Sequence, residues 1–218
     1  MEVRDILSLY GTAAGQVDGV IISSVVPELS GTFQEAAERL TGVKPLLLAP
    51  GVKTGLRILI DNPAQLGADL AAGAVAAIAK YPLPCVVFDL GTATTVSVIG
   101  KNGSFLGGAI CAGMGITQEA LTTHTALLPH VSIERPPSVI GRNSIHSMQS
   151  GLVLGTAAML DGFARRIEEE LGAECTLVAT GGLAHLVVGS CYRKILLDES
   201  LLLDGLRLIY EKNRPAGK

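Results

Sequence analysis

The sequence predicts an α/β protein of two lobes, each made of strands followed by helices. Apolar runs that favour strands alternate with segments whose apolar residues recur at helical spacing, the pattern of an α/β fold. The pattern restarts at Cys85, so we expect a first lobe over residues 1–80 and a second over residues 81–218. The chain is 48% hydrophobic and only 17% charged, against the roughly 25% charged residues of typical soluble domains. This composition favours a largely buried sheet and a subunit interface over some of the remaining apolar surface.

The first lobe is predicted to begin with a short amphipathic helix and to continue with alternating strands and helices. The helix is indicated by four apolar residues at helical spacing, which are Val3, Ile6, Leu7 and Tyr10. We expect strands at about 20–26 and 46–48, and helices at about 32–40 and 64–79. The second helix is rich in alanine and ends at Lys80, ahead of Pro82, and Asp69 lies at or near its start.

The second lobe is predicted to begin with three strands, at about 85–88, 95–99 and 105–110. Asn102-Gly103 is a hairpin signal between the last two. Helices are expected at about 117–128 and 151–171, with a loop over 129–137 and a strand at about 177–179. The longest helix has an apolar stripe spaced four, three, four, three, four, which we interpret as core, with a dimer seam as the alternative. The stripe is Val153, Ala157, Leu160, Ala164, Ile167 and Leu171.

The stretch that follows the first strand of the second lobe has the character of a phosphate site. Asp89 comes where an apolar strand ends, and Gly91 comes two residues later. A glycine at position 91 allows either a positive φ or a close approach of a ligand to the backbone. Thr92, Thr94 and Thr95 offer hydroxyl and amide groups to anionic oxygens. A carboxylate this close to phosphate implies a cation between them. The alternative is an ordinary solvated turn.

Four segments in this order resemble the type III pantothenate kinases of the actin-like ATPase superfamily, from about Val20 to Asn213. They are Ser23-Ser24-Val25-Val26-Pro27, Asp61-Asn62-Pro63 with Gly67-Ala68-Asp69, the Asp89 stretch with its glycine-rich continuation, and Thr180-Gly181-Gly182-Leu183. Residues 201–213 are similar to that family's last strand and helix. The resemblance implies an actin-like (ribonuclease H-like) two-lobe α/β fold, a homodimer, and phosphorylation of pantothenate by ATP, the first step toward coenzyme A.

The resemblance also implies roles for individual residues. Asp69 falls on the family's proton acceptor for the pantothenate hydroxyl, within a substrate-binding segment that includes Gly67, Ala68 and Leu70. Asp89 falls on the aspartate that binds a monovalent cation, potassium or ammonium, and Mg²⁺ is expected with the nucleotide. Gly91, Thr92 and Thr94 are expected to contact ATP phosphates, Gly181 and Gly182 are similar to the adenosine loop, and Ser144 falls on a substrate-binding threonine. Without the resemblance, Asp69 would be interpreted as a helix N-cap.

The chain departs from the family pattern at several positions. Leu70 and Gly73 stand where the family has arginine and asparagine, and Ile60 stands where it has tyrosine. Nothing before Ser23 resembles the family's first Asp-x-Gly-Asn-Thr phosphate loop, so we expect an incomplete first lobe with an open strand edge at 20–26. Two alternatives follow. One is a catalytically impaired paralogue that binds nucleotide or acts as an accessory protein, and the other is an actin-like kinase for another small hydroxylated substrate.

Charge and hydropathy favour a cytoplasmic protein whose partners are small molecules and a second copy of itself. The net charge is −3 and there is no run of Lys or Arg, so the sequence does not favour nucleic acid as a partner. No segment approaches the roughly 20 consecutive apolar residues of a membrane span, and the first residues do not have the pattern of a signal peptide.

Overall fold

The computed structural model describes residues 3–24 and 26–214. These residues form two compact units that interleave along the chain. Unit 1 takes its described residues from 3–55, 62–76 and 202–214, and unit 2 comprises Leu56–Asp61 and Ala77–Leu201.

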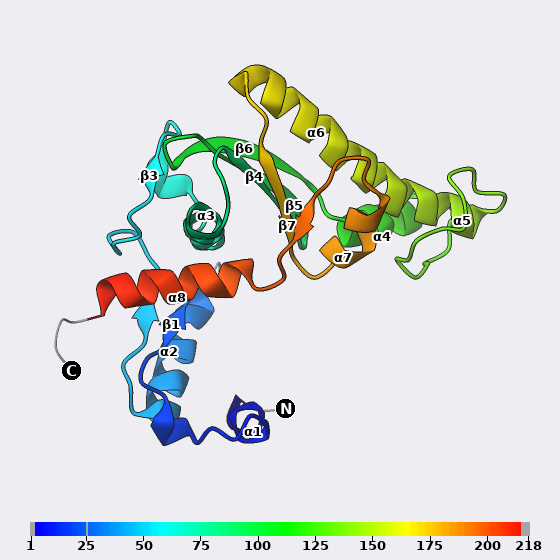
Figure 1. Cartoon of the computed structure of the whole chain (residues 1–218). Coiled ribbons are helices and arrows are strands. Elements are labelled where there is room, and N and C mark those ends of the chain that lie inside the picture. The colour runs from blue at the N-terminus through cyan, green and yellow to red at the C-terminus, as the bar shows by residue number, and fades with distance from the viewer. Residues whose placement is uncertain (1–2, 25, 215–218) are drawn as a thin grey trace. The chain divides into compact units, whose positions relative to one another are not determined.

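Unit 2 is built on a six-stranded sheet in the order β3-β6-β5-β4-β7-β8 (Figure 1). In chain order the strands are β3 (Arg57–Ile58), β4 (Cys85–Leu90), β5 (Ala93–Ile99), β6 (Ser104–Ala112), β7 (Thr176–Thr180) and β8 (Leu196–Leu197). Only β5 runs antiparallel to its neighbours, and the remaining pairs are parallel. This order with one reversed strand is that of a ribonuclease H-like sheet, so the expected actin-like α/β fold class is confirmed.

The strands predicted at the start of the second lobe are present, and each is longer than expected. β4 lies inside the sheet between β5 and β7, which is why five of its six residues are buried and its sequence is an almost unbroken apolar run. The predicted hairpin joins β5 to β6. Gly103 has a φ of 73°, and the side chain of Asn102 accepts a hydrogen bond from the Ser104 amide at 3.2 Å.

The helices of unit 2 differ in their bounds from the prediction. They are α4 (Met114–His124), α5 (Ser144–Gln149), a π-helical turn (Ser150–Leu154), α6 (Gly155–Leu171) and α7 (Ala184–Val187). The predicted helix at 117–128 begins and ends earlier, and the predicted helix at 151–171 begins as the π turn. Turns of π-helix are rare, and those that occur within α-helices are frequently found at functional sites.

Helix α6 covers one face of the sheet (Figure 1), and the apolar stripe faces that sheet. Ala157, Leu160 and Ala164 are at most 2% exposed and pack with Val86 and Phe88 of β4 in the main hydrophobic core. The stripe is therefore core, as expected. The alternative interpretation as a dimer seam is wrong for the four residues of the stripe that are buried within a single chain, whereas its last two residues, Ile167 and Leu171, are partly exposed.

Unit 1 contains mostly helix and a two-stranded parallel sheet of β1 (Ile21–Ile22) and β2 (Leu46–Leu47). Its helices are α1 (Val3–Leu9), α2 (Pro27–Thr41), the first part of α3 (Ala68–Lys80) and nearly all of α8 (Leu201–Asn213). The predicted strand at 20–26 is shorter, with Val25 outside the described residues. The chain instead enters α2 at Pro27, since proline is well tolerated at the first helical position and Glu28 suits the positive end of a helix.

The core of unit 1 lies between α3 and α8. Leu48, Ala72, Leu206 and Ile209 are buried there. A Cβ on Gly205 would overlap the carbonyl oxygen of Ala72, so this glycine is what allows the two helices to approach so closely. The expectation of a strand within residues 201–213 is wrong, because that whole range is helical and the strand β8 precedes it.

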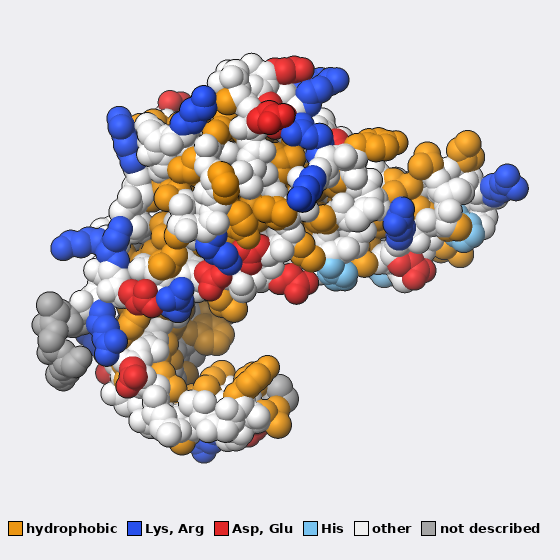
Figure 2. Space-filling view, viewed as in Figure 1, with side chains coloured by type: hydrophobic (Ala, Val, Ile, Leu, Met, Phe, Trp, Pro, Cys, Tyr) orange, Lys and Arg blue, Asp and Glu red, His pale blue; other side chains and the backbone are white. Residues whose placement is uncertain are grey.

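The surface carries both signs of charge, and Lys and Arg lie interspersed with Asp and Glu on the face shown in Figure 2. Over the part of the chain that the structure describes, none of the helices combines the length and apolar character needed to cross a bilayer.

Candidate active site

The carboxylate of Asp89 lies at the end of β4 in a row of oxygen-bearing side chains. Asp89 pairs with Thr95 of β5 on one side and with Thr180 of β7 on the other. Because residues paired across strands point to the same face, all three side chains share one face of the sheet. Asp89 and Thr95 are partly exposed, whereas Thr180 is only 6% exposed.

Thr94 lies on the other face. It pairs with Leu90, is 1% exposed, and faces the side of the sheet that bears the main core. Its predicted contact with the nucleotide stays a prediction. Side chains alternate between the two faces of the sheet along β5, so Thr95 rather than Thr94 lies beside Asp89. This alternation could have distinguished the two threonines from the sequence.

Three glycines surround the turn after β4, and they differ in why the fold needs them. Gly181 has a φ of 92°, and a Cβ there would lie 2.5 Å from Asp89 Oδ1 and 2.7 Å from the Leu90 nitrogen. A Cβ on Gly113 would overlap the carbonyl oxygens of Gly91 and Thr92. Both glycines are therefore required by packing within the protein.

Gly91 has no such requirement. Its φ is not positive, and a Cβ there would make only ordinary contacts, 3.7 Å from the Ala93 oxygen and 3.8 Å from Asp89 Oδ1. The sequence left two explanations for a glycine at position 91, and the first of them, a positive φ, is wrong. Close approach of a ligand to the backbone remains.

The turn after β4 lies against the start of α4. The Gly113 amide donates to the Thr92 oxygen at 3.2 Å, and Gly113 is the N-cap of the 11-residue helix. The unpaired amides of a helix N-terminus attract anions, and the first turn of α4 contains no acidic residue. The exposed Thr92 is therefore next to groups suited to a phosphate.

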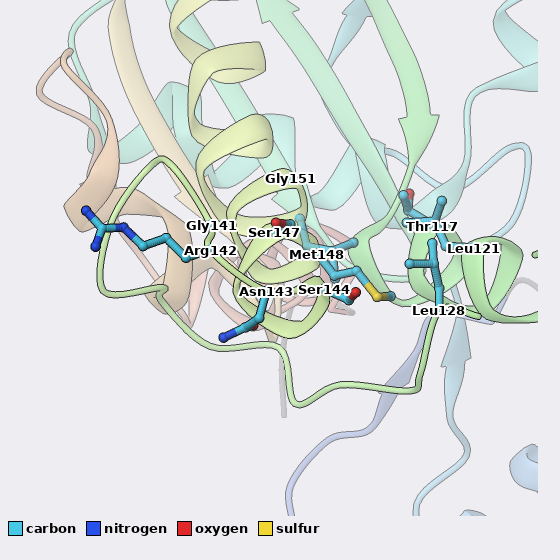
Figure 3. Close-up of a pocket in the computed structure, with 11 residues that line it drawn as sticks. Thr117, Leu121, Leu128, Gly141, Arg142, Asn143, Ser144, Ser147, Met148 and Gly151 are labelled. Atoms are coloured by element: carbon cyan, nitrogen blue, oxygen red, sulfur yellow. The ribbon is translucent and has the colours of Figure 1, made fainter.

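A pocket of about 670 Å³ begins one turn further along α4. Thr117, whose hydroxyl donates to the Gly113 oxygen at 3.0 Å, lines the pocket together with Leu121 and Leu128. The opposite wall is the segment that starts at Gly141 and enters α5 and the π turn (Figure 3). Ser144 lies in this wall. The pocket therefore has Ser144, which is predicted to bind the substrate, on one side and Thr117 of α4 on the other.

The wall is shaped by Gly141 and Asn143. A Cβ on Gly141 would overlap the backbone of Ser147, and the Asn143 side chain accepts from the His146 amide at 2.8 Å, which caps α5. In Figure 3 the guanidinium of Arg142 points away from Ser144 and Met148. The sequence analysis did not predict this short helix, although asparagine, here Asn143, is a favoured N-cap residue.

Asp69 belongs to unit 1 and lies in the first turn of α3. Its Oδ1 accepts from the Leu70 amide at 2.9 Å, and a Cβ on Gly67 would overlap that same oxygen. Asp69 is the second residue of the helix, so the N-cap interpretation is wrong by position, although its carboxylate does accept from a first-turn amide. Gly67, Ala68, Asp69 and Leu70 are all partly buried.

Two comparisons of sequence identify the relatives of this chain. The sequence model of the type III pantothenate kinase family matches residues 2–166. A type III pantothenate kinase from Anaeromyxobacter sp. (strain Fw109-5) is 46% identical over 212 residues, covering 97% of this chain and 84% of the relative. One from Koribacter versatilis is 48% identical over 208 residues, covering 93% and 76%.

A solved structure gives the same fold at lower identity. The crystal structure described as a conserved Baf family transcriptional activator from Campylobacter jejuni superposes with a TM-score of 0.60 at 20% identity, over 90% of this chain and 84% of the other. From the match over residues 2–166 and the identities of 46% and 48%, we conclude that this chain belongs to the type III pantothenate kinase family, whose members are phosphotransferases.

Proposed function

We propose that the phosphates of ATP bind at the turn after β4 and that Asp69 accepts the proton of the pantothenate hydroxyl. The reaction of the family is ATP-dependent phosphorylation of pantothenate to 4'-phosphopantothenate, the first step of coenzyme A biosynthesis. The observation that carries the proposal is the turn itself. Asp89 lies between two threonines, no side chain covers the backbone at Gly91, and the N-terminus of α4 lies against Thr92.

Phosphoryl transfer depends on positioning and on neutralisation of negative charge. The Thr92 hydroxyl and the amides of the first turn of α4 supply donors to the phosphates. The nucleoside would lie beside the end of β7, at the exposed Gly182 that follows the tight turn at Gly181.

The side chains around Asp89 suit a cation that prefers oxygen ligands. Asp89, Thr95 and Thr180 offer only carboxylate and hydroxyl oxygens. Within residues 3–24 and 26–214 no group of three or more His, Cys, Asp or Glu comes together, so hydroxyls, backbone and phosphate would complete the coordination. A potassium or ammonium ion held by Asp89, with Mg²⁺ on the nucleotide, would neutralise phosphate charge there.

Two residues are proposed to act on pantothenate, Asp69 and Ser144. Asp69 takes the proton of the attacking hydroxyl, and the Ser144 hydroxyl contacts the substrate from the pocket beside α4. Leu70 cannot form the ion pair with the pantothenate carboxylate that the family's arginine could make, so we expect affinity for pantothenate to be lower by the few kcal/mol typical of a desolvated charged hydrogen bond. We also propose that the chain forms a homodimer.

Two substitutions test the assignment of Asp89 and Asp69. Asp89→Asn should weaken ATP binding and remove the dependence of ATP affinity on potassium or ammonium. Calorimetric titration of ATP in buffers with and without each cation measures both effects. Asp69→Asn should lower kcat about 10²-fold or more and leave ATP affinity unchanged. Glu119→Gln, which removes an exposed carboxylate from α4, is the matched control and should change neither property.

Separate titrations of ATP and pantothenate distinguish the alternatives. An impaired paralogue should bind at most one of the two, and a kinase for another small hydroxylated substrate should bind ATP and ignore pantothenate. Unchanged ATP affinity in Asp89→Asn across all salts would mean that the cation site is assigned wrongly.

A further inference from the structure

The segment that joins α4 to α5 supplies residues to both sides of the pocket beside α4. Residues 125–143 contain neither helix nor strand, and we name them the α4–α5 connection. In Figure 3, Leu128 lies beside Leu121 of α4, whereas Asn143 lies beside Ser144 of α5. The path of the connection between these two points therefore sets the width of the pocket. Loops longer than roughly 12–15 residues in a compact domain are usually functional or disordered, so the contacts that order this one matter.

A buried amide at the end of α5 is bonded to the middle of the connection. Gln149 is the last residue of α5 and is 3% exposed. Its Nε2 donates to the Ser132 backbone oxygen at 3.2 Å and to Glu134 Oε1 at 3.0 Å. Glu134 Oε1 also accepts from the Ser132 hydroxyl at 3.0 Å. The amide thus uses both of its N–H groups, and because one acceptor is a carboxylate, that hydrogen bond is of the stronger kind.

The connection is attached to unit 2 on either side of this point. Val131 is 4% exposed and packs in the main hydrophobic core. Further along, the Ser150 hydroxyl donates to the Val139 oxygen at 2.7 Å. All of these residues belong to unit 2, so the arrangement is internal to one compact unit. Gln149 is the point at which the middle of the connection is bonded to the helix that begins at Ser144.

We propose that Gln149 is a positioning residue for pantothenate. It holds the middle of the connection against α5, so that Leu128 and Asn143 keep the separation that the substrate needs. Gln149 is not among the residues that line the pocket, so it acts through the connection. This inference rests on the proposed role of Ser144 in binding pantothenate. Release of the connection would lower the population of the binding-competent pocket, and the apparent affinity falls by the same factor.

An exchange of charge tests this contact with little change of shape. Gln149→Glu places a second carboxylate against that of Glu134, and the two like charges repel each other. We expect the dissociation constant of pantothenate, measured by calorimetric titration, to rise about 10-fold, as it would if the connection were correctly placed in about one molecule in ten. The dissociation constant of ATP should stay unchanged.

A second substitution should rescue the first. In the double variant Gln149→Glu/Glu134→Gln, the amide at position 134 can donate to the carboxylate at position 149. This variant should bind pantothenate more tightly than Gln149→Glu alone, because the two positions act through one interaction. Glu134→Gln alone still offers an oxygen to the Gln149 amide, so it should weaken binding less than Gln149→Glu does. A double variant that binds no more tightly than Gln149→Glu would contradict the proposed contact.

The matched control is Glu168→Gln. Glu168 accepts from both terminal nitrogens of Arg193 at 2.7 and 2.8 Å. This ion pair belongs to unit 2 and shares no residue with the pocket or with the α4–α5 connection. Glu168→Gln should therefore lower stability and leave the pantothenate dissociation constant of the folded protein at the wild-type value. An equal loss of affinity in Glu168→Gln and Gln149→Glu would mean that affinity follows stability alone, and would overturn the proposal.

Hydrogen exchange supplies a readout that does not depend on the substrate. Gln149→Glu should speed exchange of the amides in residues 128–143, and Glu168→Gln should not. If Ser144→Ala weakens pantothenate binding and Gln149→Glu does not, Gln149 has no positioning role. If Ser144→Ala keeps the wild-type affinity, the assignment of the pocket to pantothenate has failed. Unchanged exchange over residues 128–143 in Gln149→Glu would then show independently that Gln149 does not hold the connection.

Discussion

At the scale of single residues, the glycines around Asp89 have different functions although the sequence makes them look alike. Gly181 and Gly113 are needed because backbone atoms of other segments occupy the space of a side chain. A Cβ on Gly91 would make only ordinary contacts, and the φ of Gly91 is not positive. We therefore expect Gly91 to matter for ligand binding and Gly181 to matter for folding.

Alanine substitutions separate these two functions. Gly91→Ala should change the free energy of unfolding by less than about 0.5 kcal/mol and weaken ATP binding, because a methyl group would occupy the space in which a phosphate approaches the backbone. Gly181→Ala should destabilise the protein by about 1–3 kcal/mol, the cost of an L-residue held at such a φ. Urea unfolding and calorimetry with ATP measure the two effects. A stable Gly91→Ala variant with unchanged ATP affinity would remove Gly91 from the phosphate site.

The ion pair of Glu168 and Arg193 gives the stability of unit 2 a dependence on pH. Hydrogen bonds from Arg193, with a further one from the Cys175 amide, outweigh burial and lower the pKa of Glu168. A carboxyl with a lowered folded pKa stabilises the protein above its unfolded pKa of about 4.3, and this stabilisation is lost as the pH falls through the folded pKa.

Glu168→Gln should therefore cost about 1 kcal/mol of unfolding free energy at pH 7, a value reduced because Arg193 is partly exposed. The difference from wild type should shrink as the pH falls below about 4. Urea unfolding at several pH values measures it. A difference that stays constant down to pH 3 would show that the charge of Glu168 contributes nothing.

At the scale of elements, α3 and α8 pack closely because small residues line their contact. Ala72 is fully buried, and Gly205 lies against its carbonyl oxygen. Gly73 is the next residue of α3, yet no heavy atom of another segment lies within 4 Å of a Cβ built there. A glycine inside a helix lowers helix stability relative to alanine.

Alanine at these two positions should have opposite effects. Gly73→Ala should raise the free energy of unfolding by about 0.5–1 kcal/mol, and Gly205→Ala should lower it by about 1–3 kcal/mol through overpacking. Thermal and urea unfolding compare the two variants directly. Two effects of the same sign would contradict the packing of α8 on α3.

At the scale of the whole molecule, we expect a homodimer that does not use the apolar stripe of α6. Light scattering at micromolar concentration should give twice the chain mass of 22.5 kDa. Ala157→Asp should unfold the chain, because Ala157 is 2% exposed within the core, whereas Ala158→Asp on the exposed side of α6 should fold. A species of 22.5 kDa alone would contradict the homodimer.

The sequence by itself determined the local features of this protein. The apolar run before Asp89, the Asn102-Gly103 hairpin and the helical stripe of α6 follow from side-chain periodicity and turn chemistry, which act between near neighbours in the chain. The position of Asp89 at a strand end follows from the same patterns. Order and spacing of a few motifs were enough to indicate the family, because each motif is a short continuous segment.

Only the tertiary structure decided which residues meet across the chain. The approach of Gly181 to Asp89, the contact of Gly113 with Thr92 and the interleaving of the two units depend on how the sheet is assembled. Tyr81 and Asp198 are 117 residues apart, and nothing local in either segment indicates their hydrogen bond. The physical reason is that packing and buried polar pairs are properties of non-local contacts, which periodicity along the chain does not encode.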